Sequence, residues 1–386
     1  AGDTSTVSNS GGTTGMLRLG AAGVIPDGTG KGNVSIGAST AIDLNGFNET
    51  INGLSGSGTV RNDSATAATL TLGGIAPYVT QSGAGQVTIS SLAMTAGSGL
   101  TLGGNGSGQV IISSFTGASG TVTKSGSSNY LLNNGLSTVS GIKYNITGGQ
   151  LRFNGSPNPG SLVADFITIN GGRLQSQNAN NQTLGANAGI LLGDASSANG
   201  TGTIGFNGNG DSQFNINGVI ANNTGGAGNL VLIGAGGRGR IALNGTNTYT
   251  GTTTVQNTIL ALNYATNTGG RLSDSAALIL NGGRVFLTGH ASTVVTETTG
   301  GLTLGNGLNT IIAQGTATTT TLDVGAISRT DTGLLGFART RSTARRGVAA
   351  QAAGAAARRA RTAARGRLPA SRHLARQHPA RRRRPR

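Results

Sequence analysis

The chain has 386 residues, no cysteine, three histidines and a formal net charge of +16. Without cysteine it has no disulfide, no thiol nucleophile and no thiolate metal site. Residues 337–386 hold 16 arginines and no acidic residue, whereas residues 1–336 carry 12 basic and 12 acidic residues. The chain therefore divides into a neutral body (1–336) and a basic tail (337–386), which need separate interpretations.

The body contains 66 of the 69 glycines, a composition that often indicates disorder. Short alternating apolar segments that end in Gly or Asn argue against disorder, because they are typical of half-buried strands closed by tight turns. No segment of the body combines a sustained 3.6-residue apolar period with helix caps. The body is therefore predicted to be all-β, with strands in LTLGG (70–74 and 100–104), FITINGG (166–172), ALILNGG (277–283) and LTLGNG (302–307).

Three segments share one pattern, in which an apolar strand runs into Gly-Gly and a second strand follows: YNITGGQLRF (144–153), ITINGGRLQS (167–176) and LILNGGRVFL (278–287). The glycine pairs begin at residues 148, 171 and 282, which fits units of about 22 to 23 residues and a parallel β-helix. We expect a right-handed β-helix of about 15 turns and ~70 Å length, with short strands and Gly/Asn turns. Its interior should be lined by alternate strand residues, among them Leu44, Leu70, Leu72, Ile167, Ile169, Leu278, Leu280 and Leu304.

Two stretches carry a more specific pattern: DLNGFNETINGLSGSGTV at 43–60 and INGVIANNTGGAGNLVLIGAGGRGRIALNGTNTYTGTTTVQNTILAL at 216–262. Both resemble the autotransporter-associated β-strand repeat of bacterial surface proteins. The matching positions of the second stretch are Gly228, Leu230, Ile241, Leu243, Gly245, Asn247, Thr248, Tyr249, Gly251, Thr253, Val255 and Leu260. The family usually has Gly where Asn257 stands, and Asn257 is expected to adopt the left-handed conformation that the turn needs.

The resemblance implies a passenger-type β-helix that is exported to the outer surface of a bacterium or secreted, with no catalytic residue in the repeat. We therefore expect a non-enzymatic stalk, display scaffold or adhesin-like segment that acts as a monomer on an unidentified surface receptor or glycan. No cofactor, no metal and no nucleic acid is expected to bind the body. Because the chain shows neither a signal peptide nor an apolar membrane span, we interpret it as an internal or mature fragment that lacks its anchor.

The segment NLVLIGAGGRG (229–239) places Gly234, Gly236 and Gly239 in the G-x-G-x-x-G spacing of a dinucleotide site. Such a site also needs a helix at the third glycine and an acidic residue about 20 positions later. Strand-like alternation follows instead, and the next acidic residue is Asp274. We interpret the segment as a turn of the solenoid that binds no nicotinamide dinucleotide.

Two alternatives remain open. A carbohydrate-active β-helix enzyme would use two carboxylates as acid and base, and Asp274 and Glu297 are one repeat length apart, so that they could face each other on adjacent turns. The other alternative is a disordered Gly-rich surface polymer. His290 is the only histidine of the body, and we interpret it as a residue of a surface loop.

The tail changes abruptly from Thr, Asn and Gly to Arg, Ala and Pro after residue 333. These residues have GC-rich codons, so we interpret residues 337–386 as the product of a shifted reading frame and expect them to be disordered. If the tail is genuine, its arginines would bind polyanions, because each neutralised phosphate releases counterions.

Overall fold

In the computed structural model, residues 1–340 form one unit, and a second unit, 341–386, lies outside the residues that the structure describes. The interpretation of the basic tail therefore concerns residues outside the described part of the chain. The described residues are 4–8, 15–28, 30–74, 76–137, 139, 141–177, 180–194, 199–208, 212–234, 239–314, 318–330 and 332–340.

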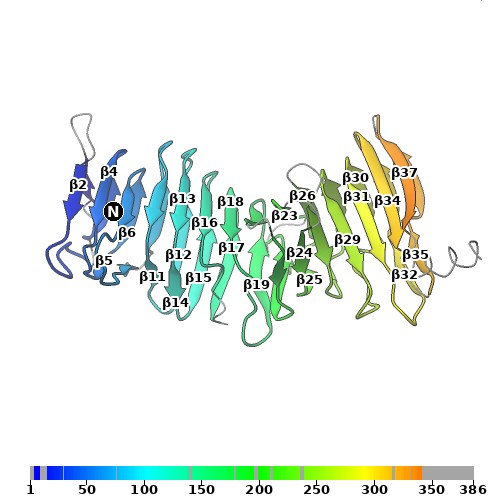
Figure 1. Ribbon diagram of the computed structural model, residues 1–386, viewed down its shortest axis with the longest axis horizontal. Helices are drawn as coiled ribbons and strands as arrows, with labels where there is room; N and C mark the ends of the chain where they lie inside the picture. The colour runs from blue at the N-terminus through cyan, green and yellow to red at the C-terminus, as the bar shows by residue number, and fades with distance from the viewer. Residues whose placement is uncertain are drawn as a thin grey trace, which may run out of the picture. The chain divides into compact units, whose positions relative to one another are not determined.

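The described residues form a parallel β-solenoid of about 13 turns without a helix (Figure 1). The prediction of an all-β solenoid is confirmed, and the disordered-polymer alternative is wrong for these residues. The chain visits three positions in the same order in successive turns, and we name the corresponding strands the first, second and third faces. Some turns lack a strand on the first or the third face.

The first face consists of a ten-stranded sheet followed later in the chain by a two-stranded sheet. Its strands are β1 (Thr4–Val7), β3 (Asn33–Ile36), β6 (Gly53–Gly56), β9 (Tyr78–Gln81), β12 (Ser98–Gly103), β15 (Gly120–Lys124), β17 (Ile142–Ile146), β19 (Val163–Ile169), β22 (Ala188–Leu192) and β25 (Ile220–Asn222), then β32 (Val295–Thr298) and β35 (Thr320–Asp323).

The second face is one continuous 14-stranded sheet. Its strands are β2 (Gly15–Arg18), β4 (Thr40–Asp43), β7 (Thr59–Arg61), β10 (Val87–Ile89), β13 (Gln109–Ile112), β16 (Asn129–Leu132), β18 (Gln150–Phe153), β20 (Arg173–Ser176), β23 (Thr201–Phe206), β26 (Asn229–Gly234), β28 (Thr253–Gln256), β30 (Ala277–Asn281), β33 (Gly301–Leu304) and β36 (Ala326–Arg329).

The third face consists of a four-stranded and a seven-stranded sheet. Its strands are β5 (Glu49–Ile51), β8 (Leu70–Leu72), β11 (Leu92–Met94) and β14 (Phe115–Gly117), then β21 (Gln182–Leu184), β24 (Gln213–Ile216), β27 (Arg240–Leu243), β29 (Ile259–Asn263), β31 (Arg284–Thr288), β34 (Leu308–Gln314) and β37 (Leu334–Thr340). Strand β37 extends past residue 336, where the body was expected to end.

The register of the second face explains the repeat length. Gln150 pairs with Arg173, 23 residues later, as the glycine pairs predicted. Arg173 then pairs with Thr203, so the next turn takes 30 residues. Because such longer turns occur, the expected number of about 15 turns was wrong. The observed 13 turns correspond to about 60 Å at ~4.8 Å per turn.

The Gly-Gly segments are corners of the solenoid, but they are not all the same corner. The first two join β17 to β18 and β19 to β20, from the first face to the second, whereas the third joins β30 to β31, from the second face to the third. The interpretation of residues 148, 171 and 282 as equivalent positions of one repeat is therefore wrong for the third pair. Each pair supplies one left-handed residue: Gly149 (φ 57°), Gly171 (φ 82°) and Gly282 (φ 63°).

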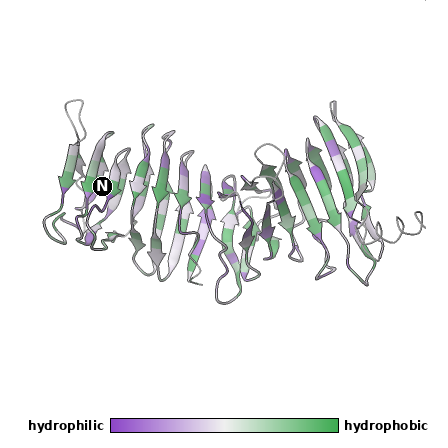
Figure 2. Ribbon diagram, in the orientation of Figure 1, coloured by the Kyte–Doolittle hydropathy of each residue, from purple (hydrophilic) through white to green (hydrophobic). Residues whose placement is uncertain are grey.

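The apolar interior is confirmed at every predicted position. The side chains of the eight residues predicted to line it are at most 5 % exposed. Along the strands hydrophobic residues alternate with polar ones (Figure 2), because successive side chains of a strand point to opposite sides. The solenoid is therefore held by a dry aliphatic interior that runs through the stacked turns.

Asn257, in the turn between β28 and β29, has a φ of 49°. The expectation that Asn257 adopts the left-handed conformation is confirmed. Asn tolerates this region better than other non-glycine residues because its short side chain can bond locally.

We expect Asn257→Ala to lower the free energy of unfolding by about 1 kcal/mol, since alanine pays the steric cost of the left-handed region. Asn257→Gly should stay within about 0.5 kcal/mol of the parent, because glycine adopts this conformation freely. Urea denaturation of the three proteins measures both differences. Equal losses for Ala and Gly would show that the conformation of residue 257 is not the cause.

Lys124, at the end of β15, is fully buried. Its Nζ donates hydrogen bonds to the carbonyl oxygens of Ser125, Gly126 (3.2 Å) and Gly148 (3.3 Å), and lies 5.3 Å from the centre of the Tyr130 ring. The ammonium group thus connects the corners of two consecutive turns. Burial lowers the pKa of Lys124 to about 8.

Because the pKa of Lys124 lies below its ordinary value of 10.5, the folded protein binds fewer protons than the unfolded chain between about pH 8 and 10.5. The contribution of Lys124 to the free energy of unfolding should therefore rise with pH across this window, by up to about 3 kcal/mol. Urea midpoints of the parent and of Lys124→Met at several pH values isolate this contribution. If the difference in urea midpoint between the parent and Lys124→Met stays constant from pH 8 upward, the depressed pKa of Lys124 is refuted.

Candidate functional site

The two carboxylates of the enzyme alternative do not form a pair. Glu297, in β32, is 1 % exposed, whereas Asp274 lies in an exposed bend of the preceding turn. Val295 and Glu297 point inward, and their neighbours Thr296 and Thr298 are more exposed. The hypothesis that the two carboxylates face each other across adjacent turns is therefore wrong, because one side chain is inside the solenoid and the other is outside.

Glu297, in β32, borders a part of the first face that has no strand. Between β25 and β32, segments 245–252 and 264–274 run without regular strand structure. In these segments, side chains bond to backbone N–H and C=O groups of neighbouring turns, which strands would otherwise pair with each other. Asn247 accepts from the Ile220 N–H (2.9 Å) and donates from Nδ2 to the Arg271 carbonyl (2.9 Å). Asn247 thus joins the turn before it to the turn after it.

Glu297 continues the same series of contacts one turn further. Its carboxylate accepts hydrogen bonds from the backbone N–H groups of Arg271 (3.1 Å) and Leu272 (2.7 Å) and from the Tyr264 hydroxyl. Burial raises the pKa of Glu297. A carboxylate enclosed by these three donors is not accessible to a polysaccharide, and its place in the structure is that of an internal hydrogen-bond acceptor.

Arg271 fills the space beside this carboxylate and is fully buried. Its guanidinium donates to the carbonyl oxygens of Gly269 (2.7 Å) and Asn263 (3.0 Å) and to Oδ1 of Asn267 (2.9 Å), and its Cζ lies 4.9 Å from the centre of the Tyr264 ring. Burial lowers the pKa of Arg271. We call Tyr264, Arg271 and Glu297 the buried polar cluster.

The G-x-G-x-x-G segment spans two strands. Strand β26 ends at Gly234, and β27 begins at Arg240 directly after Gly239, where a dinucleotide site would need the start of a helix. Gly236 and Arg238 lie outside the described residues. The predicted strand after Gly239 is confirmed.

His290 follows β31 and is half-buried, at the start of a loop whose residues 291–294 are exposed. Its Nδ1 accepts from the backbone N–H groups of Ser292 (3.2 Å) and Thr293 (3.1 Å). His290 therefore stabilises the conformation of the loop that follows it, because its Nδ1 accepts these two backbone hydrogen bonds.

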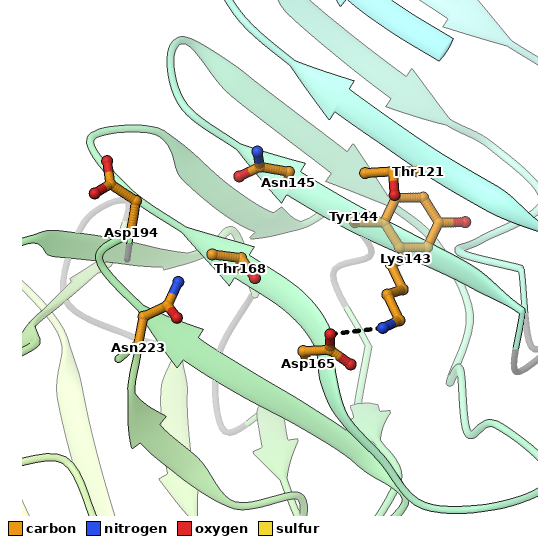
Figure 3. Close-up of a pocket in the computed structure, with 8 residues that line it drawn as sticks. All are labelled: Thr121, Lys143, Tyr144, Asn145, Asp165, Thr168, Asp194 and Asn223. Carbon is orange, nitrogen blue, oxygen red and sulfur yellow. Dashed lines mark hydrogen bonds and ion pairs between the residues drawn. The ribbon is translucent and has the colours of Figure 1, made fainter. Parts of the chain in front are cut away.

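A groove on the outer surface of the first face is the most site-like feature that the sequence did not reveal (Figure 3). It encloses about 250 Å³. Strand β19 contains a register shift between Val163 and Ile167, and this bulge directs Asp165 toward Lys143 of β17, with Oδ2 and Nζ 2.6 Å apart. The lining residues are Thr121, Lys143, Tyr144, Asn145, Asp165, Thr168, Asp194 and Asn223.

The groove offers hydrogen-bonding groups, one ion pair and the further carboxylate of Asp194. The side chains of Lys143 and Asp165 are each 44 % exposed, so their ion pair is a surface pair that contributes little stability and remains accessible. Tyr144 packs inward, with its ring edge-on to Phe166 at 5.6 Å. Amides, hydroxyls, one ion pair and the Asp194 carboxylate in a shallow groove suit a polar ligand without negative charge, such as a chain of sugar hydroxyls.

Comparisons with protein families, with curated proteins and with solved structures found no match. In the described part of the chain, no helix is long and apolar enough to cross a membrane. Nor do the described residues bring three or more His, Asp or Glu side chains together in a way that could hold a metal ion.

The buried polar cluster predicts a contrast between the two carboxylates. Glu297→Ala leaves the N–H groups of Arg271 and Leu272 without an acceptor, so we expect a loss of about 3 kcal/mol or more in the free energy of unfolding. Asp274→Ala removes an exposed carboxylate and should change it by less than about 0.5 kcal/mol. Urea denaturation measures both, and similar losses would contradict the assignment of Glu297 as an internal acceptor.

Proposed function

We propose that the chain is a non-catalytic, surface-exposed or secreted solenoid of the autotransporter-passenger kind, which acts as a stiff spacer and display scaffold. The observation that carries this proposal is the uninterrupted 14-stranded sheet of the second face, in which every strand pairs in parallel with the next from Gly15 to Arg329. Such a ladder resists bending and stretching, because each backbone hydrogen bond joins consecutive turns.

The residues of the family pattern support the proposal by their positions. Asn247 connects three turns, Tyr249 is 2 % exposed and its hydroxyl lies 2.6 Å from Thr253 Oγ1, and Asn257 makes a left-handed corner. Each has a role in stacking the turns. A repeat whose distinctive residues serve stacking is well suited to a structural element that extends from a cell surface.

The groove between Lys143 and Asp165 gives the scaffold a surface where an adhesin-like contact could form. Its polar lining fits a glycan or the polar surface of a receptor, the partners that the family resemblance implies. The enzyme alternative receives no such support, because Glu297 is enclosed by protein donors and Asp274 is exposed on its own.

Stiffness can be measured directly because the chain has no native cysteine. Thr59 in β7 and Thr303 in β33 both lie on the second face, ten strand-to-strand steps apart. Nitroxide labels on Thr59→Cys and Thr303→Cys should give a single narrow distance distribution near ~48 Å in double electron–electron resonance, from ten steps of ~4.8 Å. A broad distribution extending over tens of ångströms would be incompatible with a stiff spacer.

A further inference from the structure

Two arginines on the outer surface of the second face have no counter-charge. Arg152 in β18 and Arg173 in β20 lie on adjacent paired strands. Both side chains point away from the interior. Their sequence neighbours Leu151 and Leu174 point inward and are fully buried, and successive side chains of a strand face opposite sides. Within the described residues, neither side chain makes an ion pair or a hydrogen bond.

Most other basic side chains of the described body are compensated. Three form ion pairs with acidic residues, and two are buried against backbone carbonyls: Arg18 with Asp43, Arg61 with Asp63, Lys143 with Asp165, and Lys124 and Arg271 within the interior. In a body whose formal charges cancel, two adjacent unpaired guanidinium groups therefore form a local positive centre.

The surroundings hold these guanidinium groups in place. Arg173 lies over Gly205 of β23, where an added Cβ would meet its Nε at 2.5 Å, so glycine makes room for the guanidinium. Arg152 is the register partner of Leu131 on the adjacent strand β16. Leu131 faces outward but is only 8 % exposed, so that other side chains cover it. Both arginines are half-buried and their Nε atoms are shielded from solvent without a partner, which leaves the Nη groups to reach a ligand.

Between the arginines lies an amide pair. Gln150 stands in register with Arg173 and Gln175 with Arg152, and Gln150 Nε2 donates to Gln175 Oε1. The site thus combines two planar cationic groups with neighbouring amides. Burial lowers the pKa of both arginines, and the nearby Arg152 adds to this effect at Arg173, so an anion between them would relieve an unfavourable interaction.

We propose that Arg152 and Arg173 bind the oxyanion of an acidic sugar, a carboxylate or a sulfate, on the outer surface of the second face. Guanidinium groups form paired hydrogen bonds with such oxyanions, whereas the amides of Gln150 and Gln175 are buried and bond to each other. This site is separate from the groove of the first face and goes beyond the scaffold function.

Nucleic acid fits the same site less well. Duplex binding commonly rests on several phosphate contacts, whereas this neutral body offers two adjacent arginines. Single-strand binding relies on exposed aromatic side chains on which bases stack. Among the large hydrophobic side chains that the structure describes as exposed, the aromatic one is Phe337 in β37, far along the chain from β18 and β20.

The test is calorimetric titration of the full-length chain with a galacturonate trimer and with a sulfated disaccharide, at about 0.15 M salt to weaken long-range attraction. The uncharged galactose trimer is the ligand control. Arg152→Gln/Arg173→Gln should weaken binding of at least one acidic sugar by about tenfold or more. The matched control Arg284→Gln/Arg329→Gln removes the same charge from two exposed positions and should bind like the parent.

Three results would overturn the proposal: no binding of either acidic sugar by the parent, the same loss in both double variants, or binding of the galactose trimer with equal affinity. Preferential binding of a DNA oligonucleotide that the same variant abolishes would assign the site to nucleic acid instead. If the glutamine variant fails to fold, Arg152→Lys/Arg173→Lys retains the charge and should still weaken binding, because lysine lacks the paired donors.

Discussion

The structure depends on one constraint, that every backbone N–H and C=O of a turn must find a partner in the turn before or after it. Leaving such a group buried and unpaired costs as much as losing a hydrogen bond. On the second face the constraint is met by parallel strands throughout. On the first face two turns lack a strand, and there Asn247 and Glu297 supply the missing acceptors.

The same solution occurs near the beginning of the solenoid. Glu49 in β5 is 2 % exposed and accepts from the backbone N–H groups of Val24 (3.0 Å) and Ile25 (3.3 Å) in the preceding turn. Two buried glutamates, one in the early turns of the solenoid and one in its late turns, thus each satisfy two consecutive N–H groups of an irregular segment. A carboxylate suits this position because each of its oxygens accepts hydrogen bonds.

Charge placement follows from stacking. A like charge repeated at one position in every turn would be repelled by its neighbours about 4.8 Å away. Uncharged amides can repeat, as Asn154 and Asn133 do with a hydrogen bond of 2.8 Å between adjacent turns. Arg152 and Arg173 place like charges on adjacent turns, although two residues out of register. An arrangement of this kind costs free energy, and such places are where binding is to be sought.

The sequence predicted the features that repeat locally. Alternation identified Leu278 and Leu280 as interior residues, and the glycine pairs identified corners. It could not predict features that depend on how neighbouring turns differ in length. The bulge that directs Asp165 to Lys143 exists because β19 has extra residues relative to its partner β22, a relation that no single segment reveals.

Glu297 illustrates a different limit of the sequence. A spacing of one repeat between Asp274 and Glu297 suggested that they stack, but spacing does not determine which side of the solenoid a side chain faces. The rule that charged residues point outward would also have placed Glu297 on the surface. Its inward direction follows from the missing strands of the first face, where buried N–H groups require an acceptor.

The central claim is that consecutive turns stack in parallel and in register. Thr254 of β28 and Ile279 of β30 are register partners that point outward, and Thr303 of β33 follows one turn later. Nitroxide labels on cysteines at 254 and 279 should lie about one strand spacing apart and show strong spin exchange in continuous-wave electron paramagnetic resonance. Labels at 254 and 303 should show much weaker coupling. Absence of exchange in the first pair, or equal coupling in both, would contradict the solenoid.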